Sequence, residues 1–309
     1  MARQHTTLIV FVTSFLLAAL LALVALNKAS KKLDPQIAAQ LVFLKKPLDR
    51  FLIFSSGLTG QEQEAFRKDF VTQLTTFYGK PIGWKLALYA ATPSTPLLGY
   101  TKPLLGQFLE QMILYGSTMH IKHNFATLPL YEVDFFVRVS NEEINQATTP
   151  EQFIENIDAL YPAFELPDGF VSSFEKLEGP QKGGPSLLPL FNGLARLAVL
   201  AEEIPVPGSL TIPEWEKILS ALSGEEIITT LEGTIKRSFN KVDLVAAGLL
   251  FIQVLKKHNY RAQKGDLISL GNVTGIHQFT GTEQTLVARY DTLIEAGFHG
   301  TVTLIMDDI

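Results

Sequence analysis

Two acidic residues interrupt an apolar stretch at a spacing that could serve chemistry. Glu132 and Asp134 lie within residues 129–139, where aromatic and β-branched residues predict a β-strand. Because residues i and i+2 of a strand point to the same face, both carboxylates would converge. On a buried face such a pair needs a cation between the charges, and Mg²⁺ or Mn²⁺ prefers oxygen ligands. The alternative is an edge strand whose acids face water.

Two other charged residues stand alone among apolar neighbours. Residues 82–89 predict a strand in which Lys85 is the single charge, and residues 163–166 predict a strand that carries Glu165. Lys85 could lie at a sheet edge with its amine in water. It could also be buried and paired with acids or with a bound carboxylate. The residues themselves leave both interpretations open.

The elements around these residues predict a mixed α and β chain. Apolar periodicity and capping residues indicate helices over residues 33–46, 60–78, 150–160, 187–200 and 242–258, with a short helix beginning near Leu104. Further strands are expected over residues 119–122, 227–235 (as a hairpin), 264–272, 284–291 and 300–306. Antiparallel strands in the second half, with helices between them, favour a mixed α and β fold.

Length and composition limit the classes of function. The chain has 309 residues, enough for one large or two modest domains. Its net charge of −5 gives no sign of nucleic-acid binding, so no nucleic-acid partner is expected. It contains no cysteine, which excludes disulfides, thiolate metal sites and cysteine nucleophiles.

The amino-terminal segment predicts a membrane anchor. Residues 8–26 carry no charge, and as a helix they would span about 28 Å, close to the thickness of the hydrocarbon core. The run is too long for a signal peptide, and the lysines of residues 28–32 follow it in place of a cleavage site. We therefore expect a single-pass membrane protein that contacts the lipid bilayer through residues 8–26, with the side of the soluble body left open.

Five segments, in order along the chain, resemble one family. Residues 83–88 resemble its G-Y/R-K-I/V-G-L strand, residues 98–106 its G-x-x-x-P-x-x-G segment and residues 129–134 its P-R-I-E-x-E strand. Residues 162–168 are similar to P-A-L/I-E-I/V-x-D, and residues 264–271 are similar to A-G-D-I/V-I/V-L-T-G. The family is the 2-oxopent-4-enoate hydratase and 2-oxo-3-hexenedioate decarboxylase branch of the fumarylacetoacetate hydrolase superfamily.

The resemblance implies a fold and a division of the chain. The fold would be α+β, a mixed β-sheet roll of the fumarylacetoacetase C-terminal type with flanking helices, here preceded by one amino-terminal transmembrane helix. Residues 1–32 would form the anchor, residues 33–59 a linker with a short helix, and residues 60–309 the hydratase/decarboxylase domain. By analogy alone, the protein would form a homo-oligomer.

The resemblance also implies the residues of a metal site. In the family, the two acids of the E-x-E strand and the glutamate of P-A-x-E bind Mg²⁺ or Mn²⁺. These roles fall on Glu132, Asp134 and Glu165. The metal would polarise the 2-oxo group of a small 2-oxo acid substrate. Lys85 would be catalytic, holding the substrate carboxylate or moving a proton.

Two further residues would contact the substrate. Asn192 is the asparagine of a segment similar to the family's D-N-A-S, and Ser269 lies in the segment similar to A-G-D-I/V-I/V-L-T-G. The chain also departs from the family. Asp134 replaces a glutamate, Leu130 replaces an arginine, Phe191 replaces the aspartate of D-N-A-S, and residues 239–244 lack the glycine and proline of G-N/H-P-L.

The resemblance therefore implies an enzyme, although the departures leave three hypotheses. The first is a metal-dependent hydro-lyase or carboxy-lyase, a hydratase or decarboxylase acting on a 2-oxo or 2-hydroxydienoic acid. The second is a hydrolase that cleaves a C–C bond of an acylpyruvate. The third is a membrane-tethered relative that has lost catalysis and serves as a binding module or complex subunit, because the lost residues would surround the substrate.

Overall fold

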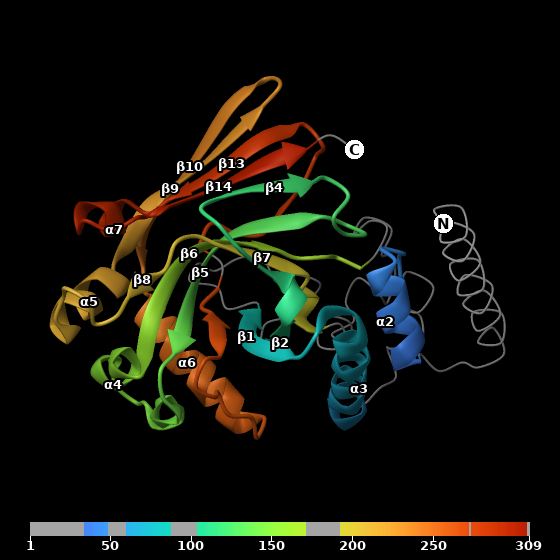
Figure 1. Ribbon diagram of the computed structural model, residues 1–309, viewed down its shortest axis with the longest axis horizontal. Coiled ribbons are helices and arrows are strands. Elements are labelled where there is room, and N and C mark those ends of the chain that lie inside the picture. The colour runs from blue at the N-terminus through green and yellow to red at the C-terminus, as the bar shows by residue number, and fades with distance from the viewer. Residues whose placement is uncertain (1–33, 49–59, 88–103, 171–191, 272, 308–309) are drawn as a thin grey trace, which may run out of the picture.

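Two β-sheets and the helices beside them form the molecule (Figure 1). The structure, a computed structural model, describes residues 34–48, 60–87, 104–170, 192–271 and 273–307.

The larger sheet carries the candidate residues. Among the described residues it has nine strands, seven of them in the order β2-β1-β11-β5-β6-β7-β3, with β12 paired to β5 and β8 paired to β6. Strand β1 runs parallel to β11, and β5 runs antiparallel to β6. The bounds are Pro81–Ala87 (β1), Leu104–Leu109 (β2), Ile113–Tyr115 (β3), Leu130–Val139 (β5), Ile157–Leu166 (β6), Leu197–Leu200 (β7), Ile204–Pro205 (β8), Leu267–Ser269 (β11) and His277–Gln278 (β12).

The smaller sheet packs on one face of the larger. Within the described part of the chain it has five strands, in the order β10-β9-β13-β14-β4. Figure 1 shows it above the larger sheet, with the β9–β10 hairpin at its outer end. The bounds are Thr118–Lys122 (β4), Leu222–Thr230 (β9), Gly233–Val242 (β10), Glu283–Arg289 (β13) and Thr301–Asp307 (β14).

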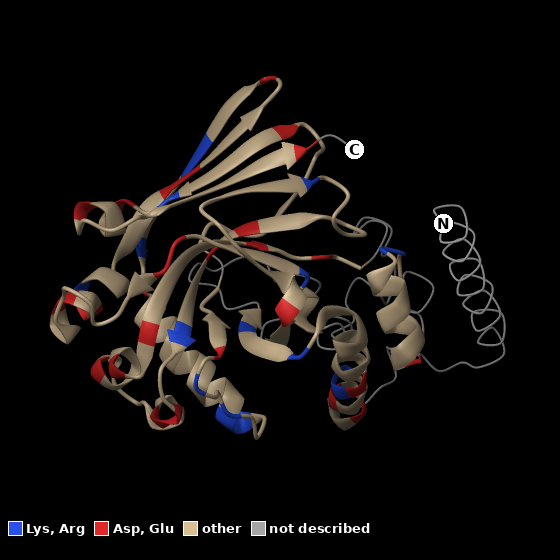
Figure 2. Ribbon diagram, viewed as in Figure 1, with Lys and Arg blue, Asp and Glu red and all other residues tan. Residues whose placement is uncertain are grey.

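Helices cover the margins of the larger sheet. Helix α2 packs against α3, and α4 packs against α5 and α6 (Figure 1). Figure 2 shows the carboxyl end of α6 as basic, from Lys256 and Lys257, which suits the helix dipole. The bounds are Pro35–Phe43 (α2), Gly60–Tyr78 (α3), Pro150–Glu155 (α4), Ile212–Leu219 (α5), Leu244–Lys257 (α6) and Asp291–Glu295 (α7), with 3₁₀ turns at Glu110–Met112 (η3), Glu142–Gln146 (η4) and Asn192–Leu194 (η6).

Strand β5 is buried on both faces. Tyr131 and Phe135 point into a core that is shared with the smaller sheet and α6. Phe136 points the other way, into a second core shared with α2 and α3. By the two-residue period of a strand, Glu132 and Asp134 lie on this second face. The edge-strand alternative is therefore wrong, because β5 lies between β11 and β6.

Several predicted elements are confirmed with small shifts of their ends. The strand over residues 129–139 is β5, the helix over residues 60–78 is α3, and the helix over residues 242–258 is α6. The hairpin predicted over residues 227–235 is β9 and β10, longer at both ends. The expected mixed α and β class is therefore confirmed.

Two predictions of helix are wrong because strand pairing overrides local propensity. Residues 104–109 form strand β2, which pairs with β1 along its whole length. The helix expected over residues 150–160 ends at Glu155, and β6 continues through Pro162. A proline has no backbone N–H to donate to a neighbouring strand. Pro162 lies opposite Ala201, one residue beyond the end of β7, so the missing N–H costs little of the pairing between β6 and β7.

A third predicted helix is also wrong. Within residues 187–200, Asn192, Gly193 and Leu194 all have positive φ angles, of 57°, 61° and 66°, which no right-handed helix adopts. The chain then enters strand β7, between β6 and β3. Residues 187–191, including the departure at Phe191, lie outside the described residues.

The predicted membrane localisation needs correction. In the part of the chain that the structure describes, none of the helices combines the length and the apolar character needed to cross a membrane. The predicted span over residues 8–26 and the rest of the predicted anchor, residues 1–32, lie outside the described residues. In the predicted linker, residues 35–43 form α2, and Ile37 and Leu41 pack into the second core.

Candidate metal centre

Antiparallel pairing of β5 and β6 gathers the three predicted metal ligands. Glu132 lies directly opposite Glu165, and Asp134 follows two residues later on the same face. Each residue offers one carboxylate oxygen, and these three oxygens lie within 4.8 Å of one another. All three side chains are buried. A single pair of neighbouring strands therefore places three carboxylates at one point.

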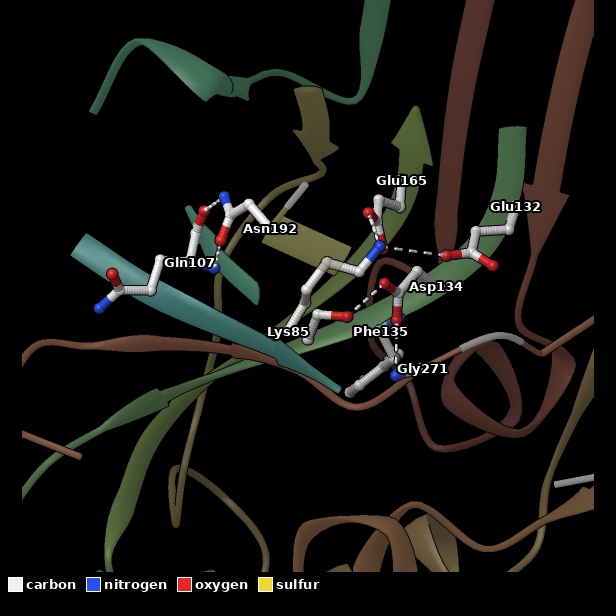
Figure 3. Close-up of polar contacts among 9 residues, drawn as sticks. Lys85, Gln107, Glu132, Asp134, Phe135, Glu165, Asn192 and Gly271 are labelled. Atoms are coloured by element: carbon white, nitrogen blue, oxygen red, sulfur yellow. Dashed lines mark hydrogen bonds and ion pairs between the residues drawn. The ribbon is translucent and has the colours of Figure 1, made fainter. Parts of the chain in front are cut away.

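Lys85 reaches the same point from β1. Strand β11 lies between β1 and β5, with Ser269 aligned to Lys85 on one side and to Phe136 on the other. The Lys85 ammonium donates a hydrogen bond to Glu165 Oε1 and lies 4.0 Å from Glu132 Oε1 (Figure 3). The lysine is 3% exposed, so the interpretation as an edge residue with its amine in water is wrong. Burial alone would lower the pKa of Lys85, but attraction to Glu165 and Glu132 outweighs it and raises that pKa.

Asp134 is held by three donors. Its Oδ2 accepts a hydrogen bond of 2.6 Å from the Ser269 hydroxyl. Its Oδ1 accepts hydrogen bonds from the backbone N–H groups of Phe135, at 2.6 Å, and Gly271, at 3.0 Å (Figure 3). These contacts fix the carboxylate in place between β11 and β5.

Two carboxyl groups of the cluster bind protons more tightly than usual. Burial, with repulsion from Glu132, raises the pKa of Glu165 to about 8 against the opposing pull of Lys85. Burial, with repulsion from Glu165, raises the pKa of Asp134 to about 7, although its hydrogen-bond donors act in the opposite direction. In the absence of another cation, protons therefore relieve the crowding of negative charge.

The cluster fits a divalent cation. Three carboxylates and one ammonium leave two negative charges in a buried site, which one divalent cation would balance. Glu165 Oε2 is buried and has no hydrogen-bond partner among the described residues, so one oxygen of this carboxylate remains for a ligand. The donor set consists of carboxylate oxygens, which suits Mg²⁺, Mn²⁺ or Ca²⁺.

Asn192 lies beside Lys85, and its amide group is bonded to strand β2. Its Oδ1 accepts a hydrogen bond from the Gln107 N–H at 2.7 Å, and its Nδ2 donates to the Gln107 carbonyl at 2.7 Å (Figure 3). Gly106 makes this approach possible, since a Cβ there would lie 2.4 Å from the Asn192 carbonyl oxygen and 2.8 Å from Lys85 Cγ. The roles of Asn192 and Ser269 as substrate contacts stay predictions.

Two supporting groups were missed from the sequence. The Tyr290 hydroxyl donates to the Asp134 carbonyl and lies 3.3 Å from the Ala163 carbonyl, so it ties β5 to β6 behind the cluster. The Gly271 N–H is a backbone group, so the type of residue at this position does not reveal that it contacts Asp134. Tyr290 lies in the strand predicted over residues 284–291, but nothing in its neighbourhood marks it as a contact of Asp134.

A second buried polar group lies on the opposite face of β5. We call it the Glu226 cluster, formed by Tyr131, Glu226, Arg237 and His277. Arg237 Nη1 lies 3.0 Å from Glu226 Oε2 and donates to the Tyr131 hydroxyl at 3.3 Å. His277 Nε2 is 4.0 Å from Glu226 Oε2, and burial together with Arg237 lowers the pKa of His277. This cluster therefore holds one carboxylate, one guanidinium and a neutral imidazole.

Comparison with known proteins places the fold. The sequence matches no family model and no curated protein. The structure is similar to 4-oxalocrotonate decarboxylase from Pseudomonas putida G7 complexed with calcium and acetate, with a TM-score of 0.58 and 14% identity over 81% of this chain and 86% of that chain. The same enzyme complexed with magnesium and adipate gives a TM-score of 0.58 and 14% identity over 81% and 87% of the two chains. At this identity the likeness establishes the fold alone: the chain has the fold of 4-oxalocrotonate decarboxylase.

Proposed function

We propose that this protein is a divalent-metal-dependent lyase that acts on a small 2-oxo or 2-hydroxydienoic acid, as a hydratase or a decarboxylase. The observation that carries the proposal is the buried cluster of Glu132, Asp134 and Glu165 with Lys85 beside it. A structural ion pair needs equal numbers of acids and bases, whereas this cluster has two acids in excess. Mg²⁺ or Mn²⁺ is the cation that we assign to it.

The chain's own residues would divide the work. Glu132, Asp134 and Glu165 would hold the cation, which supplies Lewis acidity toward a 2-oxo oxygen. Lys85, whose ammonium lies between Glu165 and Glu132, would hold the substrate carboxylate or carry a proton to or from the substrate. Burial of all four side chains strengthens each of these electrostatic interactions, because little water screens them.

The structural neighbour supports this assignment. The 4-oxalocrotonate decarboxylase of the same fold has been solved with calcium and acetate and with magnesium and adipate. Both complexes of that enzyme pair a divalent cation with a carboxylic acid. Because fold alone does not fix a reaction, the choice between hydration and decarboxylation rests on experiment.

Thermal melts and turnover test the proposal together. The purified protein should melt higher with Mg²⁺ or Mn²⁺ than with EDTA, and Glu132→Gln should remove that difference. With metal, loss of ultraviolet absorbance should report consumption of 2-hydroxypenta-2,4-dienoate, and CO₂ release should report decarboxylation of 2-oxo-3-hexenedioate. A melt that is indifferent to EDTA, to both metals and to Glu132→Gln would overturn the metal site.

A second candidate function is a catalytically silent relative that binds a ligand. Two observations favour it: the amide of Asn192 is bonded to Gln107, and the hydroxyl proton of Ser269 is donated to Asp134. Both predicted substrate contacts are thus engaged within the protein. Metal binding without turnover of any tested dienoic acid would select this candidate, whereas cleavage of an acylpyruvate would select the hydrolase.

A further inference from the structure

Ser269 makes a contact that its predicted role does not require. The residue is 1% exposed, and its hydroxyl donates its single proton to Asp134 Oδ2 at 2.6 Å. A serine hydroxyl has one proton. While that bond is kept, Ser269 has no proton left for a substrate carboxylate, which accepts hydrogen bonds and donates none.

The backbone around Ser269 fixes the face of the sheet on which this hydroxyl lies. Strand β11 lies between two partners, with Ser269 aligned to Lys85 of β1 and to Phe136 of β5. The next carbonyl of β5, that of Phe135, accepts from the Leu270 N–H at 2.9 Å. Pairing on both sides therefore keeps the Ser269 side chain on the face that carries Lys85 and Asp134.

Three donors leave Asp134 with one free acceptor position. A carboxylate has about four lone-pair positions. Both lone-pair positions on Oδ1 accept hydrogen bonds, from the Phe135 and Gly271 N–H groups. One of the two positions on Oδ2 accepts from the Ser269 hydroxyl. Asp134 can therefore offer a cation a single bond through Oδ2 unless it gives up a hydrogen bond.

Glu165 is restricted less than Asp134. Its Oε1 accepts from Lys85, while its Oε2 is buried and without a partner among the described residues. Asp134 thus presents one position on one oxygen, whereas Glu165 keeps one position on Oε1 and both on Oε2. Ca²⁺ takes six to eight oxygens and often binds carboxylates through both, whereas Mg²⁺ demands an octahedron of six. A site in which Asp134 is limited to one oxygen suits the smaller ions.

We propose that Ser269 is a positioning residue: by holding Asp134 it limits that carboxylate to one oxygen, sets the affinity for the cation and favours Mn²⁺ or Mg²⁺ over Ca²⁺. This inference rests on the proposed metal site. Hydrogen bonds to a metal ligand from residues that do not bind the metal orient that ligand, and their loss typically weakens metal affinity.

The test is calorimetric titration of Mn²⁺ and of Ca²⁺ into the purified full chain, freed of metal with EDTA and then desalted. Ser269→Ala should weaken Mn²⁺ binding about 10–100-fold. Ca²⁺ binding should weaken less, because Asp134 is freed to bind through both oxygens, so the ratio of the two affinities should fall. Ser269→Thr, which keeps a hydroxyl, should stay within about 3-fold of the parent for both ions.

Ser223 provides the matched control. Its hydroxyl also has a partner, Thr292 Oγ1 at 2.8 Å, but it lies on β9, away from the metal centre. Ser223→Ala should leave both affinities unchanged. If Ser269→Ala does not fold, as judged by its melt, Ser269→Cys is titrated in its place, because a thiol is a weak donor of similar size.

The outcomes separate this inference from the proposed function. A parent protein that binds no Mn²⁺ overturns the proposed function and this inference with it. A parent that binds Mn²⁺, with Ser269→Ala equal to it in affinity and in the Mn²⁺ to Ca²⁺ ratio, overturns the inference alone. Equal loss in the Ser269→Ala and Ser269→Thr variants also overturns it, since the hydroxyl would then not be the cause.

Discussion

Strand β5 carries a buried polar cluster on each face, and the two clusters differ in charge. On one face Glu132 and Asp134 meet Glu165 and Lys85, three acids with one base. On the other face lies the Glu226 cluster, in which one acid meets one base, Arg237. Both clusters contain a buried carboxylate oxygen with no partner among the described residues, on Glu165 and on Glu226.

The comparison shows which observation identifies a site. An unpartnered buried oxygen occurs in both clusters, so by itself it does not distinguish them. The excess of negative charge occurs only in the first, and burying it is costly unless a cation joins the site. We therefore interpret the first cluster as a metal centre and the Glu226 cluster as a structural link between the two sheets.

The largest expected effect separates the clusters by their response to metal. Glu165→Gln removes a ligand and should weaken Mn²⁺ binding by more than about 100-fold. Loss of a residue that only orients a ligand typically weakens binding by up to about 100-fold, and loss of a ligand should exceed that. Glu226→Gln should leave Mn²⁺ affinity within about 3-fold of the parent. Calorimetric titration measures both. A large loss in Glu226→Gln would contradict the assignment of that cluster to structure.

The next effect concerns stability without metal. Lys85→Met leaves three acids with no base in a buried site and should cost about 3–5 kcal/mol of unfolding free energy at pH 8. Arg237→Met should cost less, about 1–3 kcal/mol, because only one buried carboxylate, that of Glu226, loses its base, and the Arg237 side chain is itself 34% exposed. Urea denaturation in EDTA measures both values. Equal costs would remove the distinction between the clusters.

The pH dependence of stability tests the crowding of acids. The pKa values of Asp134 and Glu165 are raised by folding to about 7 and about 8. The folded state therefore binds protons that the unfolded state has already released, and the metal-free protein should lose stability as pH rises from about 5 to about 8. Mg²⁺ should raise the melting temperature most at pH 8. Melts in EDTA and in Mg²⁺ across this range check the slope, and a rising stability in EDTA would argue against it.

The smallest effect belongs to the support behind the metal centre. Tyr290→Phe removes the donor shared by the Asp134 and Ala163 carbonyls and should cost about 1–3 kcal/mol, because buried acceptors lose their partner. Mn²⁺ affinity should change by less than about 5-fold, since Asp134 keeps its three side-chain contacts. Denaturation and titration of the same sample give both numbers. A loss of affinity as large as that of Glu165→Gln would assign Tyr290 to the centre itself.

Local pattern predicts one half of the site well. The two-residue period of β5 is enough to place Glu132 and Asp134 on one face, and the family resemblance adds Glu165 and Lys85. The contacts of Ser269 and Asn192 depend on which strands become neighbours, which local pattern does not contain. Residues 104–109 show the same limit, since their leucines favour a helix and only the pairing of β2 with β1 makes them a strand.

Strand β11 has a consequence for the order in which the molecule assembles. It comprises only Leu267–Ser269, yet it enters the larger sheet between β1 and β5, which precede it by more than a hundred residues. During synthesis β5 and β6 leave the ribosome before β11, so Asp134 is made well before Ser269 and Gly271, which restrain it in the folded protein. Such distant pairings form slowly. We expect a chain that ends before residue 264 to lack the metal centre, although it contains every proposed ligand.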